Sequence, residues 1–363
     1  MKEIKRVDSA FEFVRVVIGL LIAYGVALVC ITVIMGQPPE TAVLFITGPF
    51  SNLTRFGQFM SKFILYIIMG CGMCFIYAGG RFSLLGEGTF LASACAVTCV
   101  VQFSNGFFDN LPSFVAIPLI LLVGALVGGL INLIPAISRE KLGVNELVAS
   151  IMMNYMLMFI CNYVLKVFLR DKELSYLASK AFPENVKFGS VIENTQFHTG
   201  IFVALLVVAA ASLIYYKSSL GLKIRISGSA PQFARYSGIQ MSNVLIITQV
   251  LAGMVFGIGG VVDCYAIYDR YQYGALTNYG FDGLMVAVLA RKKPLYVPLA
   301  ALLLAYIRTA AAVLNVTSNL PIELVYVMQA ILITFVAAED FLKKQKNQII
   351  FRQTLREKGE ASK

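Results

Sequence analysis

The feature that most constrains this chain is the recurrence of apolar stretches of nearly bilayer length. A bilayer core about 30 Å thick needs roughly 20 helical residues to cross it. Of the 363 residues, 14% are charged and 58% hydrophobic, whereas soluble domains carry roughly 25% charged residues. The sequence therefore predicts an all-α polytopic membrane protein with about ten transmembrane segments, at residues 12–35, 58–80, 89–103, 113–135, 147–167, 199–216, 244–264, 281–290, 294–314 and 322–341.

The first apolar run has the start of a signal peptide but not its end. Lys2, Lys5 and Arg6 precede it, as basic residues precede a signal sequence. However, residues 16–35 exceed the usual core of a signal peptide, and no small-x-small cleavage site follows them. We expect this run to be retained as the first helix.

Two of the runs are too short for an ordinary crossing and share a pattern of flanking residues. Ten residues of helix rise only about 15 Å, so residues 281–290 are expected to form a half-helix. Glu87 lies between two glycines before run 89–103, and Asp282 lies in the sequence Gly280-Phe281-Asp282-Gly283 at the start of run 281–290. The topology places the two acids toward opposite sides, as an inverted repeat of spans two to five against seven to ten would. Chance pairing is the alternative, since the halves show no clear residue-by-residue match.

The distribution of basic residues predicts the orientation. With the N-terminus inside, 21 of the 30 lysines and arginines fall on the cytoplasmic side, as the positive-inside rule requires. The net charge of +10 is then a topology signal and not a mark of nucleic-acid binding. We expect an inner-membrane protein with both termini cytoplasmic, a transmembrane permease domain at 1–341, an external loop at 168–198 and a cytoplasmic tail at 342–363.

The sequence lacks the residue sets that catalysis or a cofactor would need. No G-x-x-x-x-G-K-[ST] phosphate loop is present. The one histidine, His198, belongs to no serine–histidine or carboxylate–histidine set of the kind that catalysis uses. Cys71 and Cys74 have the spacing of a metal pair, but no second pair completes it, so we interpret all seven cysteines as packing residues. We expect no catalytic residues, no metal and no cofactor, and energy for transport must come from a partner or an ion gradient.

A basic segment at 217–239 separates two predicted spans on the cytoplasmic side. Ser229 is a candidate N-cap, Pro231 suits a first helical turn and Gly238 suits a helix end. Phe233, with Ala234 and Tyr236, gives an apolar face beside Arg235. This pattern favours a helix that inserts into a groove on another protein, and the alternative is a helix lying on lipid headgroups.

Four stretches resemble the permeases of type II ABC importers, in the branched-chain amino acid and ribose-like family that includes nucleoside and simple-sugar permeases. They are GRFSLLGEGT at 80–89, KLGVNELVASIMMNY at 141–155, LGLKIRISGSAPQFARYSGI at 220–239, and GFDGLMVAVL at 280–289 with Pro294. The resemblance covers roughly residues 60–340.

The resemblance implies a permease subunit that imports a small polar solute, with a nucleoside expected and a simple sugar as the alternative. It implies four kinds of contact: an ABC ATPase, a second permease in a heterodimer, an external solute-binding lipoprotein, and membrane lipid. The residues expected along the substrate path are Phe82, Ser83, Glu87, Asn145, Asn154, Phe281 and Asp282. The residues expected to couple to the ATPase are Arg225, Ser229, Pro231, Phe233, Ala234, Arg235, Tyr236 and Gly238.

For several of these residues, a purely structural role is the alternative to a role in transport. Glu87, Asp282 and Arg308 could serve as helix caps or reach the membrane interface, instead of facing a polar path. Phe82, Tyr155 and Phe281 could pack against neighbours instead of stacking on a base.

Two other classes of protein are alternatives to the permease. An ion-coupled transporter would not need the segment 217–239, and a membrane enzyme would need a catalytic cluster that the chain lacks. The glycine pairs Gly124/Gly128 and Gly253/Gly257 predict close helix packing.

Overall fold

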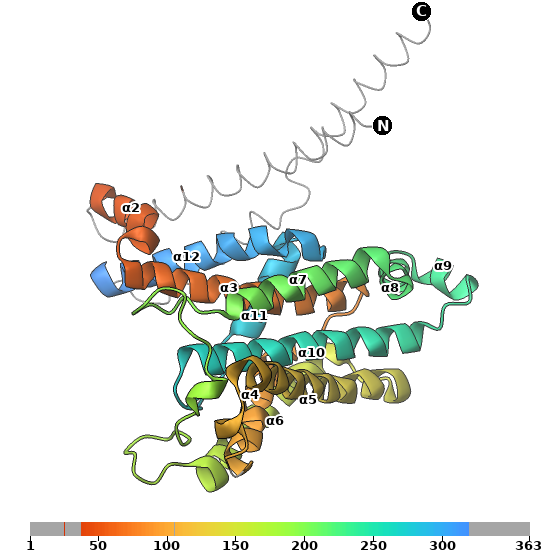
Figure 1. Ribbon diagram of the computed structural model, residues 1–363. Helices are drawn as coiled ribbons and strands as arrows, with labels where there is room; N and C mark the ends of the chain where they lie inside the picture. Colours follow the sequence, from red (N-terminus) through yellow and green to blue (C-terminus); the bar gives the residue numbers. More distant parts are fainter. Residues whose placement is uncertain (1–24, 26–37, 105, 319–363) are drawn as a thin grey trace, which may run out of the picture. The chain divides into compact units, whose positions relative to one another are not determined.

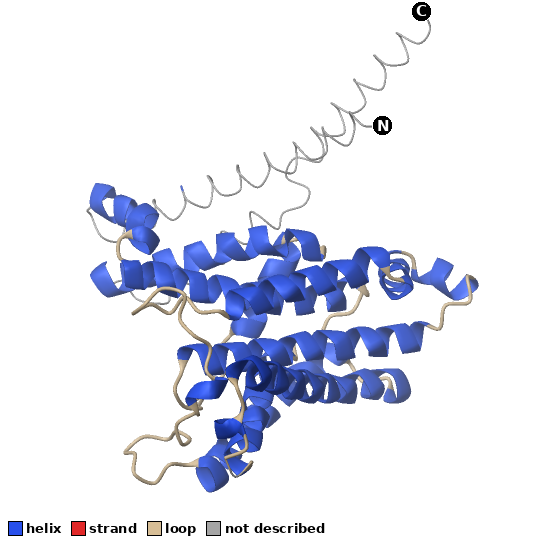
Figure 2. Cartoon of the chain, viewed as in Figure 1, coloured by secondary structure: helices blue, strands red, loops and turns tan. Residues whose placement is uncertain are grey.

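The computed structural model describes residue 25 and residues 38–104 and 106–318, and within these residues every regular element is a helix (Figures 1 and 2). The predicted spans 12–35 (residue 25 apart) and 322–341, and the tail 342–363, lie outside the described residues. The described chain divides into two compact units, one made of residues 50–306 and one containing residues 38–49 and 307–318.

Seven helices in the described part of the chain are long and apolar enough to cross a membrane. The chain is therefore a polytopic α-helical protein. The count of ten spans stays a prediction, because two predicted spans lie outside the described residues. The long helices are α3 (Leu53–Ala78), α4 (Gly86–Phe103), α5 (Ser113–Leu142), α6 (Glu146–Val164, continued by the π-turn η3, Leu165–Leu169), α7 (Gly200–Lys217), α10 (Met241–Ile267) and α12 (Val297–Ser318, preceded by η5, Pro294–Tyr296).

The two runs that looked short have different outcomes. The helix α4 starts at Gly86, three residues earlier than the predicted run, and so reaches 18 residues. The helix α11 (Tyr279–Leu289) has 11 residues, rising roughly 16 Å, so it is the expected half-helix.

Helices of the two predicted halves exchange partners in the larger unit. The first helix of each half, α3 or α10, packs against the second helix of the other: α11 lies on α3, and α4 lies on α10. A twofold relation between the halves produces this reciprocal pattern, which supports the inverted repeat.

Glycines bring α5 and α10 into backbone contact, and the two helices run side by side (Figure 1). A Cβ on Gly128 would lie 2.2 Å from the Gly253 carbonyl oxygen, and one on Gly257 would lie 2.1 Å from the Gly124 carbonyl oxygen. The predicted close packing is confirmed, and the two glycine pairs turn out to face each other.

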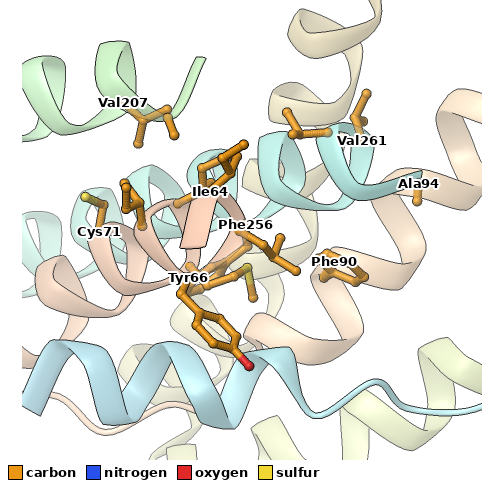
Figure 3. Packing of buried hydrophobic residues seen from close by; sticks show 14 of the residues in the cluster. Ile64, Tyr66, Cys71, Phe90, Ala94, Val207, Phe256 and Val261 are labelled. Carbon is orange, nitrogen blue, oxygen red and sulfur yellow. The ribbon is translucent and has the colours of Figure 1, made fainter. Parts of the chain in front are cut away.

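The core of the larger unit is centred on α3, whose residues from Ile64 to Ala78 are all buried. Tyr66, Phe90 and Phe256 come from α3, α4 and α10 and lie around this core (Figure 3). Cys71 and Cys74 are buried there as free thiols. Packing of α3 against both α10 and α11 positions the starts of α4 and α11.

In the smaller unit, α2 (Pro38–Thr47) and the 3₁₀ turn η1 (Gly48–Phe50) precede the first span of the larger unit. Gly48 lies against Val313 of α12, at 3.1 Å from a Cβ on Gly48 to Val313 Cγ1. This close approach joins the turn to the second half of α12.

The segment 168–198, expected as a loop, is ordered and docks on the connection between α10 and α11. The Ser179 amide donates to the Tyr271 carbonyl at 3.0 Å, and the Phe182 amide donates to the Asp269 carbonyl at 2.9 Å. The Phe182 ring stacks on Tyr265 with 4.2 Å between the ring centroids. This segment therefore acts as a strap over the α10–α11 connection.

Candidate functional site

The start of α4 is set by how α3 ends. Gly80 has φ +74°, and the amides of Gly80 and Arg81 donate back to the carbonyls of Tyr77 and Ile76 at 3.2 Å. This is a Schellman ending, in which glycine adopts the left-handed conformation at low cost. The chain leaves α3 sharply after Ala78 and enters α4 eight positions later, at Gly86.

Two polar side chains of α6 hold the start of α4. Asn154 accepts from the Gly88 amide at 2.8 Å and donates to the Leu84 carbonyl at 2.9 Å, while Ser150 accepts from the Leu84 amide at 3.1 Å. Asn154 and Ser150 are buried, as is Ser83. The structure thus brings Ser83 and Asn154 together with Glu87 at one helix start, although Asn154 lies on another helix.

The Glu87 carboxylate of α4 reaches the start of α11. Its oxygens accept from the amides of Thr277, Asn278 and Gly280 and from the Thr277 hydroxyl, at 2.5 to 2.8 Å. A helix start leaves several amides without intrahelical partners and favours a negative charge. Glu87 of α4 therefore caps α11, a contact across the two halves that supports the capping alternative.

Asp282, in the first turn of α11, is buried and accepts from the Tyr66 hydroxyl of α3 at 2.8 Å. The Tyr279 ring lies 6.4 Å from Tyr66 and 5.6 Å from Phe90, in edge-on geometry. Asp282 therefore lies beside an aromatic group that the sequence did not single out.

The aromatic path candidates are partly open. Phe82 is 49% exposed and Phe281 is 39% exposed, and the Phe82 ring lies 5.2 Å from that of Tyr77. Tyr155 is also exposed. Asn145, in contrast, is exposed and accepts from the Leu147 amide at 3.1 Å, so it caps α6. Asn145 is not brought to the helix starts.

The basic segment 217–239, expected to couple to the ATPase and called the coupling segment below, contains two helices, α8 (Ser219–Ser229) and α9 (Pro231–Tyr236). Pro231 occupies the first turn of α9, and Gly238 ends it with φ +74°, as predicted. The predicted N-cap is wrong: Ala230 holds that position, and the Ser229 hydroxyl donates instead to the Arg225 carbonyl at 2.7 Å. Ser229 is the last residue of α8, where the preceding carbonyls are within its reach.

The apolar face predicted for this segment is divided between two sides of α9. Ala234 is fully buried, while Phe233 is 60% exposed and Tyr236 is 92% exposed. Arg235 is also exposed, and Arg225 lies over the Tyr215 ring at 5.2 Å. Ala234 therefore anchors α9 to the permease, and the two aromatic rings are presented outward.

Sequence reasoning missed a polar cluster where α5, α6 and α10 meet the α3–α4 connection. Arg81 pairs with Glu140 and lies 3.7 Å from Glu146, which accepts from Gln249. Asp263, inside α10, accepts from Tyr273 and is also buried. A polar residue inside an apolar run is itself a signal, and both Gln249 and Asp263 occupy run 244–264.

Opposite charges anchor the strap 168–198. Arg270 donates to Asp171 at 2.6 Å, which holds the pKa of that carboxyl below its usual value, and Lys187 lies 2.8 Å from Asp269. His198 is buried at the end of the strap and its Nδ1 accepts from the Gly200 amide at 3.2 Å. Burial lowers the pKa of His198 to about 4, so the ring is neutral at pH 7.

The described residues hold no group of three or more histidine, cysteine or acidic side chains placed to bind a metal ion. What they do contain is a pair of helix starts, those of α4 and the half-helix α11, that are held by buried polar groups. Such helix starts within apolar surroundings characterise helical transporters. The fold and the site together therefore define a polytopic transport protein.

Comparison with known proteins narrows this class to a family. The family model described as "Branched-chain amino acid transport system / permease component" matches residues 55–337. The chain is 28% identical to the guanosine ABC transporter permease NupP of Bacillus subtilis, over 80% of this chain and 83% of that protein. It is 30% identical to the nucleoside ABC transporter permease NupB of Lactococcus lactis, over 64% and 66%. It is 24% identical to the glucose ABC transporter permease TsgB13 of Haloferax volcanii, over 93% and 90%.

The chain belongs to the branched-chain amino acid transport system permease family. It is therefore a multi-pass membrane permease subunit of an ABC importer and not itself an enzyme. A subunit of this kind works with an ATPase subunit and a solute-binding protein. The resemblance predicted from four short stretches is confirmed over most of the chain.

Proposed function

We propose that this permease imports a nucleoside. The observation that carries the proposal is the similarity to NupP and NupB, which exceeds that to the glucose permease in sequence identity. The partly open rings of Phe82 and Phe281 fit it, because an aromatic side chain can stack on a nucleobase. A simple sugar is the alternative solute.

Within this proposal, Phe82, Phe281 and Asp282 face or border the path, while Ser83, Glu87 and Asn154 hold the helix starts beside it. The contacts of Glu87 and Asn154 support this division, since their polar atoms are engaged by backbone groups of the two helix starts. Asn145 accepts from the nearby Leu147 amide and serves α6 instead.

We further propose that the subunit pairs with a second, dissimilar permease and lies in the cell membrane with both termini cytoplasmic. The basic residues on the α5–α6 and α7–α10 connections support this orientation. The segment 217–239 then faces the ATPase and the strap 168–198 faces the solute-binding protein. The domain division at residue 341 belongs to the same proposal.

Uptake and co-purification test the function together. The permease, purified from its native cells with an affinity tag, is expected to bring down an ATPase and a second permease. Membrane vesicles holding this complex and its solute-binding protein should accumulate radiolabelled guanosine when ATP is supplied on the cytoplasmic side. Glucose uptake without guanosine uptake would establish the sugar alternative, and guanosine uptake driven by an ion gradient without ATP would refute the proposal.

The orientation has its own test. Single cysteines placed within residues 175–190 should react with an impermeant maleimide added outside intact cells. Cysteines within residues 222–228 should react only after the membrane is opened. Equal reactivity of the two sets from the same side would contradict the topology.

A further inference from the structure

The coupling segment touches the permease core at an unusually close contact. A Cβ on Gly228, near the end of α8, would lie 2.0 Å from the Ala78 carbonyl oxygen and 2.9 Å from the Gly80 amide nitrogen. A Cβ on Gly80 would in turn lie 3.0 Å from Gly228 Cα. The backbone of the coupling segment therefore presses directly on the turn that ends α3.

That turn carries Arg81, whose guanidinium pairs with side chains of two other helices. It pairs with Glu140 near the end of α5 and lies 3.7 Å from Glu146 in the first turn of α6. Glu146 also accepts from Gln249 of α10. All of these side chains are mostly or fully shielded from solvent, where removing one partner of an ion pair is costly.

The cluster lines a small recess between α5, α6 and α10. Ala136 and Leu245 form part of its wall. On its other side the turn leads into α4, where Glu87 caps α11. One short turn thus contacts the coupling segment, pairs with the end of α5 and the start of α6, and leads into α4, whose Glu87 caps α11.

We propose that Gly80 and Gly228 form the joint through which the coupling segment moves the start of α4, and that Arg81 is a positioning residue that holds α5, α6 and α10 together until the joint moves. This inference rests on the proposed role of segment 217–239 in binding the ATPase. A movement of α8 toward the turn displaces it, because the two backbones are in contact without intervening side chains. A shift of the turn then withdraws the Arg81 guanidinium from its carboxylate partners and opens the recess.

Accessibility of the recess tests this directly in the complex of permease, ATPase and solute-binding protein. Ala136→Cys is labelled with a maleimide, above the background of protein without that change, in the absence of nucleotide and after trapping with ATP and vanadate. The proposal expects labelling to differ between the two states. Arg81→Gln should label at the rate of the open state in both, and its guanosine uptake per ATP should fall about tenfold, the size of a typical coupling between sites.

Gly228→Ala should abolish the response of labelling to nucleotide while the ATPase still co-purifies. Gly189→Ala is the matched control, because a Cβ there meets no atom within 4 Å. Ser138→Ala, a half-buried position near the end of α5 whose hydroxyl donates within its own helix, is the control for Arg81→Gln. If Gly228→Ala fails to assemble, Arg81→Gln alone decides, because it leaves the backbone unchanged.

Normal uptake per ATP in Arg81→Gln, or a wild-type response of labelling in Gly228→Ala, would overturn the inference and leave the proposed function standing. A wild-type complex without guanosine uptake or ATP hydrolysis would refute the proposed function instead.

Discussion

At the scale of single residues, the site is held by buried polar atoms whose partners are backbone groups. Glu87 is the clearest case, because its carboxylate meets amides of three residues that belong to another helix start. A sequence can show that an acid lies beside glycines in an apolar setting. It cannot show which amides the carboxylate will meet, because those belong to residues 190 or more positions away.

Replacing Glu87 by glutamine tests this contact. One oxygen becomes an NH2 group, which cannot accept from an amide and leaves a buried donor without its partner. We expect the free energy of unfolding to fall by about 1–3 kcal/mol, and guanosine uptake to fall in parallel. Thermal unfolding and uptake are measured on one preparation, with the exposed Glu193→Gln as the control. Lost uptake at unchanged stability would instead place Glu87 on the path.

His198 gives a pH dependence of known sign. Its folded pKa of about 4 lies below the usual value of 6.5, so its stabilising effect is complete above pH 6.5 and is lost as pH falls toward 4. Protonation places a hydrogen on Nδ1, which now accepts from Gly200. Relative to His198→Asn, the wild-type protein should lose about 3 kcal/mol of stability across this interval. Thermal unfolding from pH 7.5 to 4.5 measures this, and equal pH slopes would contradict it.

At the scale of helices, the patterns that the sequence predicted well were those set by local chemistry. The lengths of the apolar runs located the long helices. The spacing of Gly124/Gly128 and Gly253/Gly257 predicted close packing, because glycine has no side chain to hold two helices apart. The docking of strap 168–198 and the Arg81 cluster could not be predicted in this way. Both depend on residues brought together from distant parts of the chain, such as Asp171 with Arg270. The wrong prediction of Ser229 as an N-cap shows the same limit at short range. Its hydroxyl could either accept from an amide of α9 or donate to a carbonyl of α8, and it donates to the Arg225 carbonyl.

The α5–α10 contact predicts a cost for a single methyl group. Alanine normally stabilises a helix relative to glycine by roughly 0.5–1 kcal/mol. In Gly253→Ala, however, the new Cβ would lie 2.3 Å from the Gly128 carbonyl oxygen, so the helices must separate. We expect a net loss of about 1–3 kcal/mol, measured by thermal unfolding in detergent. Gly274→Ala, where a Cβ meets no atom within 4 Å, should change little. Equal stability of both variants would contradict the close contact.

At the scale of the molecule, α4 receives connections from both predicted sides of the membrane. The strap 168–198 holds the α10–α11 connection, which ends at the amides that Glu87 accepts from. The coupling segment contacts the turn between α3 and α4 through Gly228 and Gly80. An importer must relate the arrival of solute outside to ATP hydrolysis inside, and α4 is the element that both connections share.

The outward rings of α9 provide the last prediction, which concerns the link to the ATPase. Phe233 and Tyr236 are exposed in the isolated chain, so replacing either by aspartate should leave the permease folded. In the assembled importer, the new charge would be buried in the groove that received the ring, at a cost of several kcal/mol. We therefore expect Phe233→Asp to reach the membrane at the wild-type level but to lose guanosine uptake by about tenfold or more, since 1.4 kcal/mol already corresponds to a factor of ten.

Two further variants separate docking from folding. Phe233→Leu keeps an apolar side chain and should retain most of the uptake. Ala234→Asp places a charge on the buried side of α9, so it should lower the thermal stability of the permease itself, before any ATPase is bound. If Phe233→Asp transports normally at normal abundance while Ala234→Asp unfolds, α9 is a structural helix of the permease and its exposed face does not bind the ATPase.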